Sequence, residues 1–452
     1  MQGKLFVEDE TGSLLQPQLK RSLKLWHLIV YGIIIIQPTA PMGIYGVVSN
    51  IARGHVVVTI LIAMVAMLFT AISYGRMARV YPRAGSAFSY VSEELNPKAG
   101  YVVGWAMLMD YILNPIICII WCSQAARNIV PDIPFAFWMI AFVLLSTFLN
   151  TRGIQTSGRV NAALSIVMSL VVLLFLGEGF RYIFSTVHPT ARDLFRPFYD
   201  PSTFSTSTLF QGTSVAVLTY IGFDGISTMA EEVENPRRNI LLATVFTCLI
   251  IGILSMVEVY VAQVVWPATT PFPASMVDTA FVHVAARVGG TFLFQLLNAT
   301  LLVANLGSAI AAQFGASRLM YSMGRDHSLP PRIFGAVDRR HRVPRNNVLI
   351  VGAIAVAGGF LLSYQQGAEL LNFGAFIAFM GVNAAALVHY KFRSKEKVAF
   401  PFLIPALGIL VCAFIWIHLS HSAQILGTLW VCVGLIVAWL MHRRKRSTLQ
   451  AQ

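Results

Sequence analysis

The chain has 452 residues, of which 56% are hydrophobic and only 12% are charged, and its mean hydropathy is +0.68. A soluble domain averages about 25% charged residues, so this composition excludes a water-soluble protein of this size. The formal net charge is +13, but the Lys and Arg lie in short clusters between long apolar runs. That pattern argues against nucleic acid as a partner and indicates a lipid bilayer.

Twelve membrane spans are predicted, because a helix needs about 20 mostly apolar residues to cross the hydrocarbon layer. They are residues 25–52, 54–75, 100–126, 133–151, 160–177, 201–223, 239–257, 288–317, 346–368 and 370–390, and two more within 398–442. Residues 1–22 and 443–452 form cytoplasmic tails, and 185–207 an extracytoplasmic connection. With this count, all but six of the 33 Lys and Arg fall on the cytoplasmic side, as the positive-inside rule requires. The expected location is the bacterial cytoplasmic (inner) membrane, crossed many times.

The first span is interrupted near its middle by Gln37-Pro-Thr-Ala-Pro-Met-Gly43. Two prolines each remove a backbone N–H donor and clash with the preceding turn. In lipid, the carbonyls freed in this way need a partner from protein, water or ligand. A simple proline kink is the alternative. Because the segment also carries polar side chains, we predict that it binds substrate through Gln37, Thr39, Ala40, Met42 and Gly43.

The sixth span contains Tyr220-Ile-Gly-Phe-Asp-Gly225, in which two glycines flank an acid within the bilayer. An ionised carboxylate is costly in hydrocarbon, so it normally faces a cavity or a partner. The alternative is a glycine pair that packs helices beside a neutral, hydrogen-bonded Asp224. We predict a second break here, with substrate-binding residues Tyr220, Gly222, Phe223, Asp224 and Gly225.

The two breaks lie five spans apart, and this odd spacing inverts the second copy of a repeat in the membrane. Broken helices at matching positions of inverted halves indicate a midplane binding site. Half-helix N-termini offer N–H groups to a carboxylate, and unwound carbonyls accept from an ammonium. The predicted fold is therefore an all-α membrane protein with two inverted five-helix repeats, 23–184 and 208–393, and two additional C-terminal helices, 398–442. Its expected substrate is an amino acid or small amine.

Four motifs resemble those of the amino acid–polyamine–organocation (APC) transporter family. They are the segments 81–90 (YPRAGSAFSY), 103–111 (VGWAMLMDY), 220–232 (YIGFDGISTMAEE) and 317–326 (SRLMYSMGRD). The resemblance runs from about residue 23 to 443, and within the family it is strongest to bacterial putrescine importers. It implies the fold of the sodium-coupled leucine transporter and a permease that works by alternating access.

Two positions depart from the family pattern. The putrescine importers carry an aspartate in the first break where this chain has Gly43. A diamine needs a carboxylate for each ammonium, so half of that pair is missing from the break. Proton-coupled relatives carry a fifth-helix lysine at the position that matches Met168. The coupling ion, H⁺ or Na⁺, therefore stays open.

Further polar residues lie within the predicted spans. Asp110 in the third span is either a structural acid or a ligand for substrate or proton. Asn305 and Ser308 in the eighth could hydrate a cation, although helix–helix hydrogen bonds are the commoner use. Glu258 in the seventh is expected near the outer end, in contact with water. A cytoplasmic gate is predicted from the acids Glu231 and Glu232 and the basic residues Arg318 and Arg325, with a solvated charge run as the alternative.

The sequence carries no motif that would indicate a membrane enzyme or a membrane sensor. No nucleophile–base motif, phosphate loop or metal-ligand cluster indicates a membrane enzyme, and no soluble output domain indicates a sensor. No cofactor or metal is predicted. The first-ranked substrate is a small neutral amino acid or related amine, and putrescine is the second.

Overall fold

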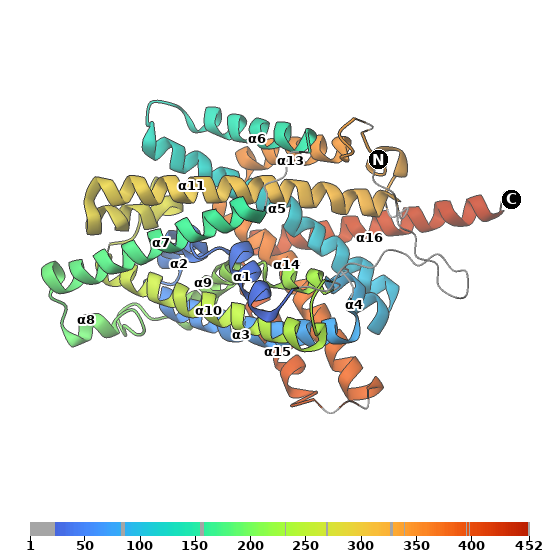
Figure 1. Ribbon diagram of the computed structural model, residues 1–452, viewed down its shortest axis with the longest axis horizontal. Coiled ribbons are helices and arrows are strands. Elements are labelled where there is room, and N and C mark those ends of the chain that lie inside the picture. Colours follow the sequence, from blue (N-terminus) through green and yellow to red (C-terminus); the bar gives the residue numbers. More distant parts are fainter. Residues whose placement is uncertain are drawn as a thin grey trace.

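The computed structural model describes residues 23–82, 86–153, 158–230, 232–267, 270–325, 329–338, 340–394, 396 and 398–450. These residues are helical apart from their connections and one parallel bridge between Leu23 and Val233. The helices lie roughly along the long axis of an elongated bundle (Figure 1). Their bounds are α1 Leu25–Ile36, α2 Ala40–Ile51, α3 Val56–Val80, α4 Ser86–Glu94, α5 Pro97–Ile129, α6 Phe135–Thr151, α7 Gly158–Tyr182, η1 Ile183–Val187, α8 Ala191–Phe195, α9 Thr206–Ala216, η2 Val217–Tyr220, η3 Phe223–Met229, α10 Pro236–Val265, η4 Val277–Thr279, α11 Ala280–Arg325, α12 Pro331–Phe334, α13 Arg345–Leu361, α14 Tyr364–Val388, η5 His389–Arg393, α15 Leu403–Trp416 and α16 His421–Gln450.

The described part of the chain is an all-helical membrane protein. Seven helices are long and apolar enough to cross a bilayer, and there are eight candidates if α1 and α2 count as one span bent by 47°. Three shorter apolar helices, α6, α13 and α15, accompany them. Large apolar side chains are exposed on α6, α7, α10, α15 and α16, for example Leu144, Leu170, Ile253, Leu410 and Ile425. A surface of this kind is what lipid contact requires.

Close helix contacts hold the centre of the bundle together. At Gly75 of α3 an added Cβ would lie 2.5 Å from Leu241 Cα of α10, so only glycine permits this approach. Helix α5 begins after the N-cap residue Asn96, whose side-chain Oδ1 accepts a hydrogen bond from the Ala99 N–H at 2.8 Å. Trp105 of α5 and Trp430 of α16 then donate their indole N–H groups to each other's backbone carbonyls at 2.8 and 3.0 Å. Close backbone contact and reciprocal hydrogen bonds thus hold these helices together, because the hydrophobic effect does not drive helix association within lipid.

Several predicted boundaries are wrong. The chain turns between α13 and α14 at Leu362–Ser363, before the predicted end of the ninth span at residue 368. The Ser363 side chain caps α14 by accepting from the Gln366 N–H, and the Gln366 side chain accepts from the Ser363 N–H. This capping box starts a helix that runs through Glu369, which the hydropathy windows had excluded. Similarly, α11 is longer than the predicted eighth span and bends at Gly289 and Gly290.

Candidate functional site

The first break is shorter than the sequence predicts. Helix α1 ends at Ile36, and Gln37 has a positive φ of 73°. Thr39 precedes α2, which starts at Ala40 and carries Pro41 in its first turn, where a missing N–H costs little. Of the predicted residues, only Gln37 and Thr39 therefore lie outside regular helix. Ala40, Met42 and Gly43 belong to the first turn of α2, and Met42 is buried.

The second break separates η2 from η3. Helix α9 ends at Ala216, a 3-10 turn runs to Tyr220, and Gly222 has a φ of +118°, which L side chains rarely adopt. A second 3-10 segment, Phe223–Met229, carries Asp224 in its first turn. The Asp224 carboxylate accepts from backbone N–H groups of its own turn, between Gly222 and Gly225. The sequence prediction of an interrupted helix around this acid agrees with the local backbone.

The two breaks are in contact. A Cβ added at Gly222 would lie 2.7 Å from Ile35 Cγ2, and one added at Gly225 would lie 3.2 Å from Ile35 Cδ1. Ile35 is in the last turn of α1, directly before the first break. The backbone of the second break therefore packs against the end of α1, and the glycines make that approach possible.

Asp110 and Asp224 form an acidic pair in the centre of the bundle. Asp110 comes from α5 and Asp224 from η3, and the two lie close enough for their charges to interact. The phenols of Tyr74 and Tyr111 are also close enough to interact electrostatically with both acids. Tyr90 is close enough to interact with Asp224 and lies beside Ser227. Both acids are partly accessible to water, although Phe223 and Ile226 on η3 are fully buried. Within the described residues, neither carboxylate forms an ion pair with Lys, Arg or His.

Polar side chains tie the first break to its neighbours. Gln37 Nε2 donates to Ser308 Oγ of α11 at 2.7 Å and reaches the Ala304 carbonyl at 3.5 Å. Thr39 Oγ1 donates to the sulfur of Met168 on α7 at 3.5 Å. Met168 thus lies against the break, at the place where the family resemblance expects a lysine in proton-coupled relatives.

Gly43 faces two hydrogen-bonding aromatic side chains. A Cβ at this position would be 3.1 Å from the Tyr364 hydroxyl and 3.9 Å from Trp121 Nε1. Among the described residues, the buried Trp121 N–H has no hydrogen-bond partner. Two side chains that can donate hydrogen bonds therefore lie beside the N-terminal turn of α2, which itself favours negative charge.

Other predicted site residues make structural contacts. The Tyr220 hydroxyl donates to the Ile60 carbonyl of α3 at 2.9 Å, and Phe223 packs its ring against Tyr74 and Phe379. Asn305 donates to the carbonyl of Leu301 on its own helix at 2.9 Å.

The predicted gate is only partly described. Glu231 lies outside the described residues, and Arg325 is engaged in an interaction of its own. The backbone carbonyl of Glu232 accepts a hydrogen bond from the Leu23 N–H, and the Arg318 guanidinium lies over the Phe314 ring. Within the described part, Glu232 and Arg318 do not pair with each other, so the gate stays a prediction.

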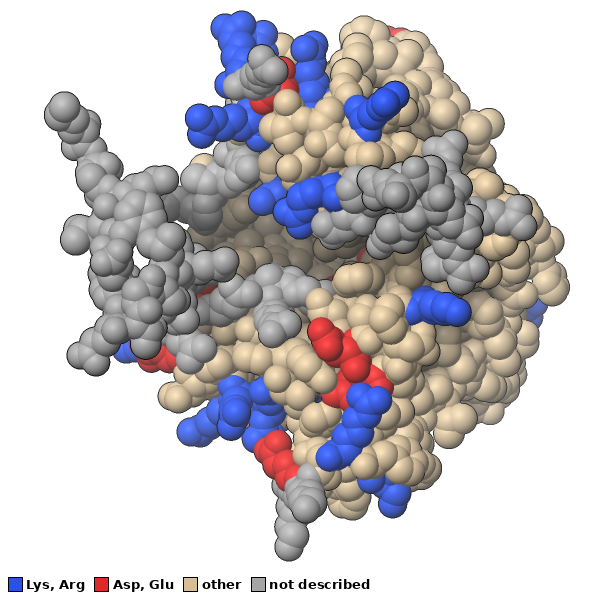
Figure 2. Space-filling view, turned by 90° about the vertical axis from the view of Figure 1, so that its right-hand side faces the viewer, with Lys and Arg blue, Asp and Glu red and all other residues tan. Residues whose placement is uncertain are grey.

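The two ends of the bundle differ. Figure 2 looks onto the end where α3, α11 and α16 finish, and it shows a hollow near the middle with Lys and Arg around it. At the opposite end, aromatic rings pack between α2, α7 and α11. Phe281 contacts Tyr45 and Phe175, and Tyr45 also contacts Phe272. Asn50 exchanges two hydrogen bonds with the Phe272 backbone at 2.8 and 2.9 Å. This end is therefore closed by packed side chains.

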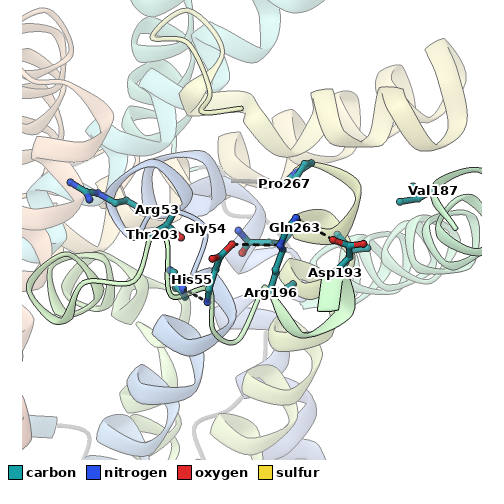
Figure 3. A pocket seen from close by; sticks show the side chains of 12 residues that line it. Arg53, Gly54, His55, Val187, Asp193, Arg196, Thr203, Gln263 and Pro267 are labelled. Atoms are coloured by element: carbon teal, nitrogen blue, oxygen red, sulfur yellow. Dashed lines mark hydrogen bonds and ion pairs between the residues drawn. The ribbon is translucent and has the colours of Figure 1, made fainter. Parts of the chain in front are cut away.

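A pocket of about 160 Å³ lies outside that aromatic layer. Figure 3 shows His55, Arg196, Asp193 and Gln263 on its wall. His55 Nε2 accepts from the Asp200 N–H at 3.1 Å, and Nδ1 lies 3.0 Å from the Ala52 carbonyl, so the ring is held on both sides. Hydrogen bonds from the Ser202 hydroxyl and backbone N–H lower the pKa of Asp200. The pocket is distinct from the acidic pair.

Sequence reasoning missed the residues that only packing brings to the site. Tyr74, Tyr90, Tyr111, Trp121 and Tyr364 come from four different helices, and none stands in a break. Tyr90 and Tyr111 each end one of the family-like motifs, which was the available signal.

Comparisons with known proteins agree with this architecture. The family model described as "Amino acid permease" matches residues 28–449. The chain is 32% identical to the low-affinity putrescine importer PlaP of Escherichia coli K12, over 93% of each chain. It is 26% identical to the branched-chain amino acid permease BcaP of Bacillus subtilis, over 99% of this chain and all of the relative. It is also 26% identical to the vacuolar cationic amino acid transporter 4 of Arabidopsis thaliana, over 82% of this chain and 63% of the relative.

Proposed function

The chain belongs to the amino acid permease family, and from that premise we propose that it is a secondary active transporter that imports a small diamine across the cytoplasmic membrane by alternating access. The observation that carries the proposal is the acidic pair, Asp110 and Asp224, which lies inside the bundle, partly accessible to water, without a basic partner in the described residues. Unpaired charges inside a membrane protein are costly and mark substrate or ion sites.

The proposed fold has twelve spans with both termini in the cytoplasm. The seven long helices, the bent pair α1–α2 and the three shorter apolar helices account for eleven spans. The twelfth is the interrupted segment from α9 through η3, which is too broken to count as one long helix. Residues 23–184 and 208–393 are then the inverted repeats, and the contact between the two breaks supports this arrangement.

The charge of the site favours a substrate with two positive groups. Gly43 cannot provide a carboxylate in the first break, so the sequence alone favours a monoamine or zwitterion. Asp110 can provide the second countercharge from α5 instead, because it lies within charge range of Asp224. The relative at 32% identity is a putrescine importer, which supports a diamine.

A neutral amino acid is the second candidate, and the surroundings of Gly43 favour it. The Trp121 N–H, the Tyr364 hydroxyl and the N-terminal turn of α2 together form a corner that suits a carboxylate. In this case Asp224 would bind the amino group and Asp110 would stay neutral. Family members named as amino acid permeases are compatible with this reading.

Alternating access requires that only one side of the site is open at a time. The aromatic layer of Tyr45, Phe272 and Phe281 closes the outer end, and the opposite face is hollow (Figure 2). We assign this conformation to the cytoplasm-facing state. Glu231 or Glu232 would pair with Arg318 or Arg325 when the inner side closes.

Competition binding with matched ligands tests the substrate. Putrescine and butylamine share a four-carbon chain and differ in one ammonium, and leucine and alanine represent neutral amino acids. We expect putrescine to compete at least tenfold better than each of the others, because a charge-assisted contact contributes about 1.5–3 kcal/mol.

Two Asp→Asn variants, each of which removes one carboxylate charge, test which acid binds which ammonium group of the substrate. Asp110→Asn should weaken putrescine binding at least tenfold and change butylamine binding less than threefold, whereas Asp224→Asn should weaken both. Glu178→Gln, at an exposed ion pair on α7, is the control and should change neither. A neutral amino acid that outcompetes putrescine tenfold, with no effect of Asp110→Asn on putrescine, would reject the diamine in favour of the second candidate.

A further inference from the structure

Glu258 is a buried acid without a partner. It lies in α10, seven residues before the helix ends at Val265, and its side chain is 0% exposed. Within the described part of the chain, neither carboxyl oxygen makes a hydrogen bond. The expectation of a water-exposed acid near the outer end is therefore wrong, because neighbouring helices cover this face of α10.

Helix α10 packs against the broken first span. Thr247 and Glu258 are eleven residues apart, which is about three helical turns, so they share one face of α10. Thr247 points at α1, since a Cβ added at Gly32 would lie 2.6 Å from its Oγ1. The second half of that span, α2, also packs on α10.

Among the residues that the structure describes, no charged group forms an ion pair or a hydrogen bond with the acid. Besides α2, the elements packed on α10 are α1, α3, α7, α11 and η1 to η3. Their described titratable and charged residues are His27, Tyr31, Tyr45, Tyr74, Arg76, Arg79, Glu178, Arg181, Tyr182, Tyr220, Asp224, His283, Arg287, Arg318, Tyr321 and Arg325. Within the described residues, none of these groups donates a hydrogen bond to either carboxyl oxygen of Glu258. The nearest ions on α7, Glu178 and Arg181, pair with each other.

An ionised carboxylate in these surroundings would be an unpaired buried charge, which costs several kcal/mol. The acid must therefore carry a proton in this conformation. As a structural residue it would be a poor choice, because its unsatisfied oxygens cost more than an apolar side chain of similar size. The Ser255 hydroxyl, one turn earlier on α10, is also buried without a partner in the described residues.

The pocket on the outer side lies further along the same helix. Gln263 and Val264 line the pocket shown in Figure 3 and lie five and six residues from Glu258, about 8–9 Å along the helix. The Gln263 Nε2 has no partner among the described residues, while its Oε1 accepts from the Val56 N–H at 3.2 Å.

We propose that Glu258 is the proton-binding site of this transporter and that its protonation and deprotonation couple substrate import to the proton gradient. The carboxylate takes one proton from the outer side, holds it as a neutral acid in the cytoplasm-facing state, and releases it to the cytoplasm when the helices packed on α10 rearrange. The proposal rests on the transport function proposed above and adds the coupling ion to it.

Reconstituted vesicles test the coupling. With an acidic exterior, the wild type should accumulate labelled putrescine, and Glu258→Gln should reduce this accumulation at least tenfold. Exchange of labelled for unlabelled putrescine without a gradient should stay within threefold of the wild type, because it needs no net proton movement. Glu258→Leu, an apolar side chain that suits the buried position, should behave in the same way. Glu178→Gln should resemble the wild type in both assays.

A second measurement needs no substrate. If folding keeps the Glu258 proton and unfolding releases it, thermal stability in detergent should fall as the pH rises from about 5 to 8. This fall should be smaller in Glu258→Gln and Glu258→Leu. Gradient-driven accumulation at wild-type level in these variants, or a wild type that ignores the proton gradient, would overturn the proposal. Absence of both exchange and ligand-induced stabilisation in the wild type would instead reject the transport function, and the pH dependence would still decide whether Glu258 holds a proton.

Discussion

The contact between the two breaks can be tested at Gly222. Alanine at this position must adopt a φ of +118°, and its Cβ would lie 2.7 Å from Ile35 Cγ2. A disfavoured backbone conformation costs about 1–3 kcal/mol, and overpacking costs about 1–3 kcal/mol more. We expect Gly222→Ala to destabilise the protein by about 2–6 kcal/mol and to abolish most uptake, because η3 and Asp224 cannot keep their place against α1.

Gly225→Ala is the matched control. Its Cβ would meet the same residue, but at 3.2 Å from the terminal Ile35 Cδ1, and Gly225 is not among the residues of positive φ. The methyl group at the end of Ile35 can move by a few tenths of an ångström, so the cost should stay below about 1 kcal/mol. Both variants are compared by melting temperature in detergent and by initial uptake rate.

A double-mutant cycle separates the two costs of Gly222→Ala. Ile35→Ala removes the clashing Cγ2, so the double variant should recover the overpacking part, about 1–3 kcal/mol, and retain the backbone part. Equal stability of Gly222→Ala and Gly225→Ala would refute the reasoning, since it would mean that neither the positive φ nor the contact with Ile35 constrains the break.

Two further predictions concern the first break and the topology. Gln37→Leu and Ser308→Ala each remove the 2.7 Å hydrogen bond between α11 and the break. Each variant should lower the uptake rate about two- to tenfold, as expected for the loss of one buried hydrogen bond. The double variant should be no worse than either single variant, because both substitutions remove the same hydrogen bond. Additive losses would show that the two side chains act independently. Green fluorescent protein fused after Gln452 should fluoresce and alkaline phosphatase at the same point should be inactive, because both termini are expected in the cytoplasm; the opposite result would reject the twelve-span arrangement.

The sequence by itself determined the class of protein and the places where its helices break. Hydropathy measures the cost of moving a segment into lipid, and that cost depends on the segment alone. The prolines after Gln37 and the glycines around Asp224 also act locally, through missing N–H donors and permitted φ angles. For that reason the positions of the breaks could be predicted, although the exact ends of α2 and α14 could not.

Only the tertiary structure decided which polar groups meet. In a membrane protein, the surfaces that face lipid and those that face other helices are both apolar, so the pattern of a span does not tell which side points inward. Asp110 could therefore not be placed beside Asp224, and Glu258 was expected in water although α10 holds it inside the bundle. Both outcomes depend on how helices distant in sequence pack side by side, and that packing decides where an uncompensated charge can bind a substrate or a proton.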